Sequence, residues 1–287
     1  MPRILDGRAL AAARGEALRP RIALLRARLG RPPGLGVLLV GDDPAAQIYV
    51  RNKARAAAAL GMASRLVRLP ATAPAAVVLA AVEALNRDHE VDAFLVQLPL
   101  PAPLVAAPVI AAIAPGKDAD GLLPSSLGRL LADLPGPRPC TPAAIMALLA
   151  SVPVDLAGAH AVVLGRSAIV GRPAGLMLLQ ADATVTLCHA LSRDVAAHAR
   201  AADVLVVAVG QAGLVRADWV RPGAVVIDVG INRQAGRVVG DVDFAGVAPR
   251  AAAITPVPGG VGPMTIAMLL ENAVSLAEAA ALPAGPP

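Results

Sequence analysis

The chain has 287 residues, of which 56% are hydrophobic and 1% are aromatic, and its formal net charge at pH 7 is +5. This length suits two domains or one large α/β domain, with a core of Ala, Val, Leu and Ile. The basic residues are scattered along the chain. With four aromatic residues in total, a stacking surface for single-stranded nucleic acid is not expected, and we predict no nucleic-acid partner.

The order of residues along the chain argues against export, membrane insertion and a bound metal. The first twenty residues mix charged and apolar side chains, unlike a signal peptide, and prolines interrupt the most apolar stretch, residues 98–115. Cys140 and Cys188 are isolated, and the four histidines show no metal-ligand spacing. We therefore expect reduced thiols, a cytoplasmic location, no membrane partner and no metal site.

Short β-branched runs alternate with helical stretches along the N-terminal half. Strands are predicted at residues 35–41, 63–70 and 91–101, and helices at 48–61 and 75–88. Apolar strands that alternate with helices predict a parallel sheet covered on both faces. A stretch rich in glycine and proline, residues 131–142, is the best candidate for a linker.

The alternation restarts after this linker. Strands are predicted at residues 159–165, 183–190, 202–210 and 223–230, and helices at 143–151, 173–182 and 264–281. This second α/β unit has the pattern of a nucleotide-binding domain, and the last helix is expected to return to the first domain. We assign residues 1–138 plus 264–287 to one domain and residues 139–263 to a second, Rossmann-like domain.

Two residues of the predicted helix 48–61 suggest chemistry. Of the 26 lysines and arginines, only Lys53 and Lys117 are lysines. A lysine retained against this bias indicates a task that a guanidinium cannot perform, such as exchanging a proton near neutral pH. Tyr49 lies one helical turn earlier on the same face. The alternative is a tyrosine that packs on a lysine stem at the surface.

Three further segments offer polar groups or exposed backbone. Gln97 ends a predicted strand, at the edge where open α/β sheets bind ligands, although a buried glutamine can also simply pair with backbone. The segment PGKDADG, residues 115–121, places a lysine and two aspartates beside a turn; the alternative is a solvated turn with an internal ion pair. The glycines of TPVPGGVGPMT, residues 255–265, would let the backbone approach a flat ligand closely.

The turn GRSAIVGRP, residues 165–173, follows a strand and opens a helix, a context that suits pyrophosphate binding. Ser167 replaces the second glycine of the usual motif, so a plain βα turn is the alternative. The next strand ends in CHALS, residues 188–192, without the carboxylate that binds the ribose of NAD. Arg166 and Arg193 lie nearby in sequence and suit a 2′-phosphate, so this region favours NADP.

Eight segments occur in an order that resembles the bifunctional methylenetetrahydrofolate dehydrogenase/cyclohydrolase family. They are VGDDPAAQIYVRNKARA (40–56), VQLPLP (96–101), PGKDADG (115–121), PCTP (139–142), GRSAIVGRP (165–173), PGAVVIDVGINR (222–233), GDVDF (240–244) and TPVPGGVGPMT (255–265). The resemblance spans nearly the whole chain. It implies an α/β protein with an N-terminal folate-binding catalytic domain, an NADP-binding Rossmann domain, a cleft between them, and a homodimer.

The resemblance also implies the roles of individual residues. Lys53 matches the catalytic lysine, Tyr49 the tyrosine that stacks on the substrate, and Gln97 the amide that positions the lysine. Asp120 matches the carboxylate that binds the pterin ring. The implied folate-binding residues are Tyr49, Gln97, Leu98, Asp120, Gly262 and Pro263, and the implied cofactor-binding residues are Gly165, Arg166, Ser167 and Ile231.

The implied activity is oxidation of 5,10-methylenetetrahydrofolate to 5,10-methenyltetrahydrofolate with NADP, followed by hydrolysis to 10-formyltetrahydrofolate. Such an enzyme supplies one-carbon units for purine and formyl-methionyl synthesis. The alternatives are an enzyme with one of the two activities and a non-catalytic nucleotide- or folate-binding protein. A shikimate-type dehydrogenase is disfavoured because no second basic pocket for a small carboxylate is evident.

Several positions depart from the family pattern. Leu123 and Ser126 stand where a histidine and an asparagine are usual, and Ala46 and Ala144 replace a common serine and glycine. Ala190 lacks a hydroxyl that could bond the cofactor phosphate, which leaves the strength of the NADP preference open. These changes leave Tyr49, Lys53, Gln97 and Asp120 intact.

Overall fold

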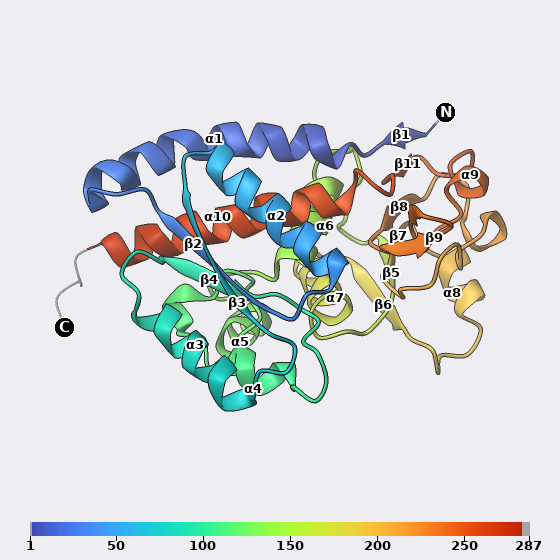
Figure 1. The fold of residues 1–287 in the computed structure, drawn as a ribbon. Helices are drawn as coiled ribbons and strands as arrows, with labels where there is room; N and C mark the ends of the chain where they lie inside the picture. Colours follow the sequence, from blue (N-terminus) through green and yellow to red (C-terminus); the bar gives the residue numbers. More distant parts are fainter. Residues whose placement is uncertain (1, 283–287) are drawn as a thin grey trace. The chain divides into compact units, whose positions relative to one another are not determined.

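The computed structural model describes residues 2–282, which form two compact α/β units, each built on its own parallel sheet (Figure 1). One unit comprises residues 13–138 and the chain from residue 269 onward, and we call it the three-stranded unit. The other comprises the chain up to residue 12 and residues 139–268, and we call it the six-stranded unit. The two-domain α/β architecture predicted from the sequence is confirmed.

The division between the units falls inside two helices, α1 (Gly7–Leu29) and α10 (Val261–Ala281), which have residues in both. Strand β1 (Arg3–Ile4) pairs in parallel with β11 (Ala253–Ile254). This pairing explains why the N-terminal residues belong to the six-stranded unit, whereas the sequence suggested the other domain. The first residue and the last five residues of the expected domains lie outside the described residues.

The sheet of the three-stranded unit is parallel, with the order β3-β2-β4. Its strands are β2 (Gly34–Val40), β3 (Ala63–Leu69) and β4 (Ala93–Val96). Its shorter helices are α2 (Pro44–Ala59), α3 (Ala75–Arg87), α4 (Ala106–Ala111), η1 (Pro115–Lys117) and α5 (Pro124–Leu131). Strand β4 ends before the predicted residue 101, because the prolines that follow have no N–H group for a sheet ladder.

The core of this unit lies between α3 and the central strands. Val78, Val82 and Leu85 follow helical spacing along α3 and are buried together with Phe94 of β4. Every side chain of β2 and β4 is buried, whereas most side chains of the edge strand β3 are exposed. The expectation of a sheet covered on both faces therefore holds for β2 and β4 and not for β3.

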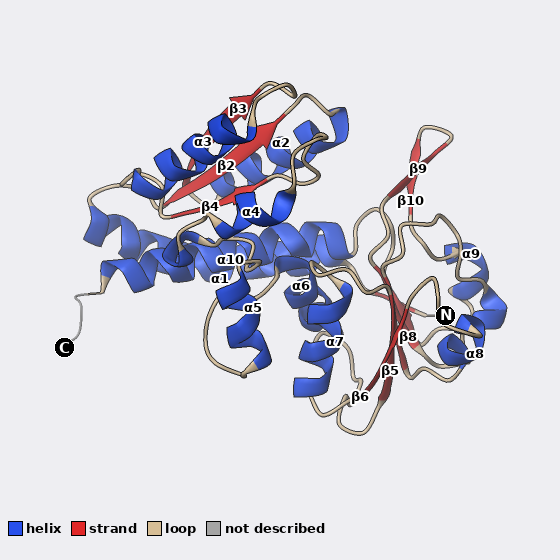
Figure 2. Cartoon of the chain, turned by 90° about the horizontal axis from the view of Figure 1, so that it is seen from below, coloured by secondary structure: helices blue, strands red, loops and turns tan. Residues whose placement is uncertain are grey.

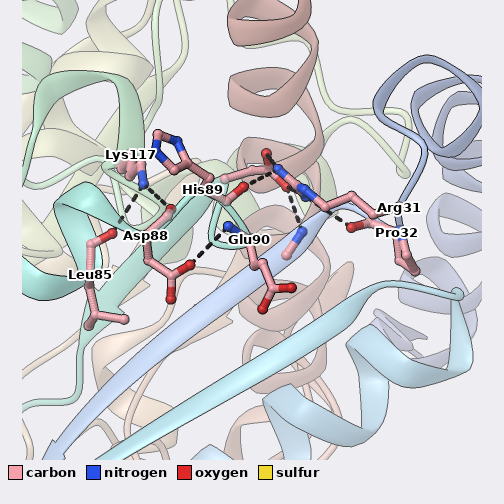
Figure 3. A network of polar contacts seen from close by, with 9 residues as sticks. Arg31, Pro32, Leu85, Asp88, His89, Glu90 and Lys117 are labelled. Carbon is pink, nitrogen blue, oxygen red and sulfur yellow. Dashed lines mark hydrogen bonds and ion pairs between the residues drawn. The ribbon is translucent and has the colours of Figure 1, made fainter.

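An ion pair fixes the amino ends of β2 and β4 (Figure 3). Both terminal guanidinium nitrogens of Arg31 lie 2.8 Å from the carboxylate oxygens of Asp92. The same carboxylate accepts a hydrogen bond from Gly34 N at 2.7 Å, at the first residue of β2. The paired geometry and burial of Asp92 make this pair more specific than an ordinary surface ion pair.

The sheet of the six-stranded unit is also parallel, with the order β1-β11-β8-β7-β5-β6. The strands not yet named are β5 (His160–Leu164), β6 (Thr184–Cys188), β7 (Val204–Val207) and β8 (Val225–Asp228). The helices are α6 (Cys140–Leu149), α7 (Gly171–Gln180), α8 (Val195–Arg200), η2 (Ala217–Trp219) and α9 (Phe244–Val247). β5, β7 and β8 are the buried centre of the sheet, as their apolar sequences predict.

Helices cover both faces of this sheet, with α6 and α7 on one side and α8 and α9 on the other (Figure 2). Helix α7 connects β5 to β6, and α8 connects β6 to β7. The chain therefore leaves β5 and β7 in opposite directions, which creates a switch point between these neighbouring strands. Open α/β sheets bind ligands outside the carboxyl ends of the strands at such a point.

A hairpin not predicted from the sequence follows β8 (Figure 2). Its antiparallel strands are β9 (Asn232–Gln234) and β10 (Arg237–Val239). The two residues that join them, Ala235 and Gly236, have φ angles of +47° and +76°. Positive φ at both turn residues matches the twist of a two-residue hairpin.

Helix α10 is long and apolar enough, by length and composition alone, to cross a membrane. Half of its most apolar window is buried inside the protein. Within the three-stranded unit, its Glu271 and Glu278 pair with Arg14 and Arg21 of α1 at 3.0 and 2.6 Å. A core helix meets the same criteria of length and composition, and these contacts describe α10 as one.

Candidate active site

Lys53 lies on the buried stripe of α2. This stripe consists of Ala46, Val50, Lys53 and Ala57, whose spacing of three or four residues places them on one helix face. Only 9% of Lys53 is exposed. Its Nζ donates a hydrogen bond to Oε1 of Gln97 at 3.1 Å. The lysine is therefore directed toward the sheet, in contrast to the alternative of a solvated surface side chain.

Gln97 is held in one orientation by the end of β4. Its backbone N–H donates to Leu38 O of β2 at 2.8 Å, and its side-chain Nε2 donates to Leu98 O, also at 2.8 Å. Because Nε2 faces a carbonyl oxygen, Oε1 is the atom left to accept from Lys53. The side chain is 8% exposed. Its amide pairs with backbone, as one of the two alternatives for Gln97 proposed, and with the lysine at the same time.

The turn that precedes α2 sets the position of Tyr49 and Lys53. Gly41 follows β2 with a φ of +86°, and Asp43 caps the helix by accepting a hydrogen bond from Ala46 N at 2.7 Å. Pro44 occupies the first helical turn, where its missing N–H costs nothing. Tyr49 is half-buried, one turn before Lys53 on the same helix.

Asp120 lies in a segment that runs beside β4. Asp118 forms a parallel bridge with Phe94, and Ala119 N donates to Phe94 O at 3.2 Å. The same parallel alignment carries the half-buried Asp120 toward the carboxyl end of β4, where Gln97 follows. The candidate residues Tyr49, Lys53, Gln97, Leu98 and Asp120 thus all belong to the three-stranded unit.

The acidic and basic neighbours of Asp120 have structural partners that the sequence did not indicate. Asp118 is buried and accepts hydrogen bonds from Leu123 N at 2.9 Å and from Ser126 Oγ at 2.7 Å. Ser126 therefore still supplies a polar contact at a position where the family usually has asparagine. The interpretation of residues 115–121 as a solvated turn with an internal ion pair is wrong for Asp118.

Lys117 joins the same segment to the end of α3 (Figure 3). Its Nζ donates to Leu85 O at 3.1 Å and to Asp88 O at 2.7 Å. The last carbonyls of a helix have no partner within the helix, so a cation there both satisfies and stabilises them. Burial lowers the pKa of Lys117 from its ordinary value. Lys117 thus has a structural environment unlike that of Lys53.

In the six-stranded unit, two glycines and a serine shape the turn between β5 and α7. A Cβ atom on Gly171 would lie 2.1 Å from Gly165 O, and one on Gly165 would lie 2.2 Å from Ala208 O. Ser167 Oγ accepts hydrogen bonds from Val170 N at 3.1 Å and Gly171 N at 3.4 Å. Ser167, which stands where the usual dinucleotide-binding motif has its second glycine, thus closes the turn with its own hydroxyl group.

The remaining cofactor candidates lie at the carboxyl edge of the same sheet. Arg166 and Ser167 are exposed in the turn after β5, beside the switch point. Ile231 follows β8 and is 49% exposed. No carboxylate lies among residues 189–192, directly after β6, where Ser192 Oγ accepts from His189 N at 2.9 Å; Asp194 follows and caps α8. This edge can accept an anionic ligand with a phosphate near Arg166.

Gly262 and Pro263 lie in the first turn of α10, also in the six-stranded unit. A Cβ atom on Gly262 would meet nothing within 4 Å. The preceding Gly260 serves packing instead, because a Cβ on it would lie 2.8 Å from Pro256 O. The glycine-rich segment therefore combines one close backbone contact with one open position.

Two buried aspartates that the sequence analysis missed organise the loops after β7 and β8. Asp228 ends β8, is 3% exposed, and accepts hydrogen bonds from Gly230 N, Asp241 N and Val242 N at 2.9 to 3.0 Å. Burial raises the pKa of Asp228 to about 6, an effect that the backbone donors oppose and the nearby charge of Asp241 increases. The motif GDVDF, which contains Asp241, was the available signal.

The pKa of Asp228 predicts a pH-dependent contribution to stability. An unfolded aspartate titrates near pH 3.8 and the folded one near 6, so the folded state binds its proton first as pH falls. Asp228 should therefore add up to about 3 kcal/mol to the free energy of unfolding below pH 4, and this contribution should disappear as pH rises through 6.

Urea unfolding of the parent and of Asp228→Asn between pH 4 and 8 measures this contribution, because other carboxyl groups cancel in the difference. The free energy of unfolding of the parent should rise relative to the variant as pH falls from 7.5 to 4. Parallel pH profiles for the two proteins would show that Asp228 titrates normally.

Comparison with known proteins places this arrangement in a family. Residues 5–120 match the model of the tetrahydrofolate dehydrogenase/cyclohydrolase catalytic domain, and residues 139–281 match the model of its NAD(P)-binding domain. A curated relative from Acidiphilium cryptum, "Bifunctional protein FolD", is 56% identical over 278 residues, which are 96% of this chain and 98% of the relative.

Solved structures agree with this match. The bifunctional FolD methylenetetrahydrofolate dehydrogenase/cyclohydrolase from Campylobacter jejuni is 45% identical, covers 98% of this chain and 100% of its own, and has a TM-score of 0.94. The Trypanosoma brucei enzyme, complexed with NADP and an inhibitor, is 42% identical, covers 97% of this chain and 98% of its own, and has a TM-score of 0.93. With both domain models matched in order and relatives this similar along nearly its whole length, the chain belongs to the tetrahydrofolate dehydrogenase/cyclohydrolase family.

Proposed function

We propose that this protein is a bifunctional enzyme that oxidises 5,10-methylenetetrahydrofolate to 5,10-methenyltetrahydrofolate with NADP and then hydrolyses the product to 10-formyltetrahydrofolate. The observation that carries the proposal is the buried hydrogen bond from Lys53 to Gln97 in a chain that belongs to this family. A buried amine with one neutral partner is suited to proton transfer, and an enzyme that catalyses hydrolysis requires such a group.

In the oxidation, the bridging carbon of the substrate loses a hydride, and the lone pairs of its two flanking nitrogens stabilise the resulting cation. This step depends on alignment more than on a base. Tyr49 supports the folate by stacking, and Asp120 binds the pterin ring through hydrogen bonds. Leu98, Gly262 and Pro263 are the other folate-binding residues that we propose. Tyr49 and Asp120, both in the three-stranded unit, orient the pterin ring and thereby the bridging carbon.

In the hydrolysis, water attacks the methenyl carbon, and the bond from that carbon to N5 then breaks. Water loses one proton as it attacks and its second as the formyl carbonyl forms, while N5 gains one as its bond breaks, so one proton is released overall. Lys53 accepts the first proton and donates one to N5, because an amine can act as base and then as acid. Gln97 orients the amine through Oε1 without placing a carboxylate charge beside it.

NADP, when bound, accepts the hydride. Gly165, Arg166, Ser167 and Ile231 bind it at the carboxyl edge of the six-stranded sheet. The proposal of a cofactor site here rests on the tight turn after β5. Gly165 has no room for a Cβ because Ala208 O lies against it, and Gly171 has none because Gly165 O does. The exposed guanidinium of Arg166 pairs with the 2′-phosphate.

Lys53→Met should reduce conversion of methenyl- to 10-formyltetrahydrofolate at least 100-fold, because general acid–base catalysis commonly contributes that much or more. The absorbance of the methenyl compound reports both its formation with NADP and its hydrolysis. The variant should therefore accumulate the methenyl compound when supplied with methylenetetrahydrofolate and NADP.

The chain offers a matched control in its other lysine. Lys117→Met removes two hydrogen bonds to carbonyl groups and should lower the free energy of unfolding by about 1–3 kcal/mol while hydrolysis continues. Hydrolysis by Lys53→Met at the parent rate would exclude the proposed role of Lys53. Absence of both activities in the parent would exclude the proposed function.

Arg166→Ala should weaken NADP binding by about tenfold and NAD binding much less, because a charge-assisted bond to the 2′-phosphate exists in the first case alone. Binding titrations with the two cofactors measure the ratio. Arg200→Ala, which removes an exposed arginine from the last turn of α8, serves as the charge-matched control. An equal loss of affinity for NADP and for NAD would show that Arg166 does not bind the 2′-phosphate.

We also infer a homodimer in the cytoplasm. The edge strands β3 and β6 carry the exposed leucines Leu66 and Leu187. Exposed apolar edge strands of this kind are often covered by a second protein chain. Cys140 and Cys188 are buried thiols, which suit a reducing compartment. Sedimentation at micromolar concentration should give twice the chain mass of 28.8 kDa. A particle of 28.8 kDa at all concentrations would contradict the dimer.

A further inference from the structure

Asp241 connects the two loops that follow β7 and β8. It is fully buried, with 0% of its surface exposed. Its Oδ2 accepts hydrogen bonds from Val209 N at 2.7 Å and Gly210 N at 2.9 Å, in the loop after β7. Its Oδ1 accepts one from Asn232 Nδ2 at 2.8 Å, in the first residue of β9. A single carboxylate thus binds both loops at the carboxyl edge of the sheet.

The backbone around Asp241 leaves little room for another arrangement. A Cβ on Gly230 would lie 2.3 Å from Asp241 Cγ, so a glycine is required where the loop after β8 passes the carboxylate. Asp241 N donates in turn to Asp228 Oδ1 at 2.9 Å. Asp228 therefore fixes the backbone of Asp241, and Gly230 lies directly beside its carboxylate.

The three donors explain why this position carries an acid. Two backbone N–H groups point at one oxygen and an amide N–H points at the other, so both oxygens must accept. An asparagine here has one oxygen and would direct an N–H₂ group at one set of donors. Because the group is buried, water cannot replace the lost contact.

We propose that Asp241 is a positioning residue of the cofactor site, which rests on the function proposed above. It acts through Asn232, whose neighbour Ile231 is a cofactor-binding residue, and through Val209 and Gly210, which follow the strand next to the switch point. By joining the two loops, Asp241 sets the place of Ile231 relative to the turn of Arg166. Its loss should weaken cofactor binding without direct contact with the cofactor.

Asn232 makes a sharp test possible, because the hydrogen bond between the two side chains can be reversed. In Asp241→Asn, the new oxygen can still accept from Val209 and Gly210, but the new amide nitrogen faces Asn232 Nδ2. In Asn232→Asp, two carboxylates face each other. The double variant Asn232→Asp/Asp241→Asn restores one donor and one acceptor, with the direction of the bond exchanged.

Binding of NADP, measured by calorimetric titration of the purified full chain, is the primary readout because it needs no turnover. Each single variant should weaken NADP binding roughly tenfold, the size of one buried hydrogen bond to a charged group. The double variant should recover to within about threefold of the parent. The KM for methylenetetrahydrofolate should change much less than the KM for NADP in all three.

Asp203→Asn is the matched control. Asp203 precedes β7 at the opposite end of the strand and accepts a hydrogen bond from His160 N at 2.8 Å. It should shift the melting temperature and leave NADP binding unchanged. Single variants that melt earlier but bind NADP like the parent, or a double variant no better than the singles, would overturn the proposal. A parent that binds NADP but has no activity would instead overturn the proposed function alone.

Discussion

The hydrogen bond between Lys53 and Gln97 is the constraint on which the catalytic side of the three-stranded unit depends. It joins residues 44 positions apart, one on α2 and one at the end of β4. A buried amine requires a hydrogen-bond partner, and Oε1 of Gln97 supplies one. The neighbours Val50 and Ala57 are buried on the same face, so the helix cannot rotate without exposing them. Packing of apolar side chains thereby fixes the direction of a polar one.

Local patterns predicted the parts of the fold that are stabilised locally. The apolar runs that became β2, β5, β7 and β8 are buried, and the buried stripe of α2 follows helical spacing. β1 was missed because it has two residues, and its partner Ala253 lies at the other end of the chain. No periodicity exists in so short a strand, and its existence depends on a neighbour that the sequence around it does not reveal.

The acids show a second limit of sequence analysis. Asp118 belongs to a segment that could be interpreted as a solvated turn, and the sequence assigned no role to Asp228 or Asp241, yet all three are buried. Their partners are mostly backbone N–H groups of nearby loops, and such groups are present at nearly every residue. A sequence therefore cannot distinguish an acid that binds a ligand from one that binds the protein's own backbone. The distinction depends on whether a loop turns back over the carboxylate.

The two units thus use polar groups in different ways for the same geometric reason. In parallel sheets the carboxyl ends of the strands lie at one edge, and the loops that leave them carry unpaired N–H groups. In the three-stranded unit, Gln97 pairs with the backbone of this edge through its N–H and its Nε2. Its side-chain oxygen accepts a hydrogen bond from the amine of Lys53. In the six-stranded unit, Asp228 and Asp241 accept hydrogen bonds from backbone N–H groups of the loops after β7 and β8. Arg166, in the turn after β5, is exposed. The buried carboxylates of Asp228 and Asp241 thereby hold the loops after β7 and β8 through backbone N–H groups. The turn after β5 lies two strands from β8, and its Arg166 and Ser167 are not covered by such a carboxylate and remain exposed.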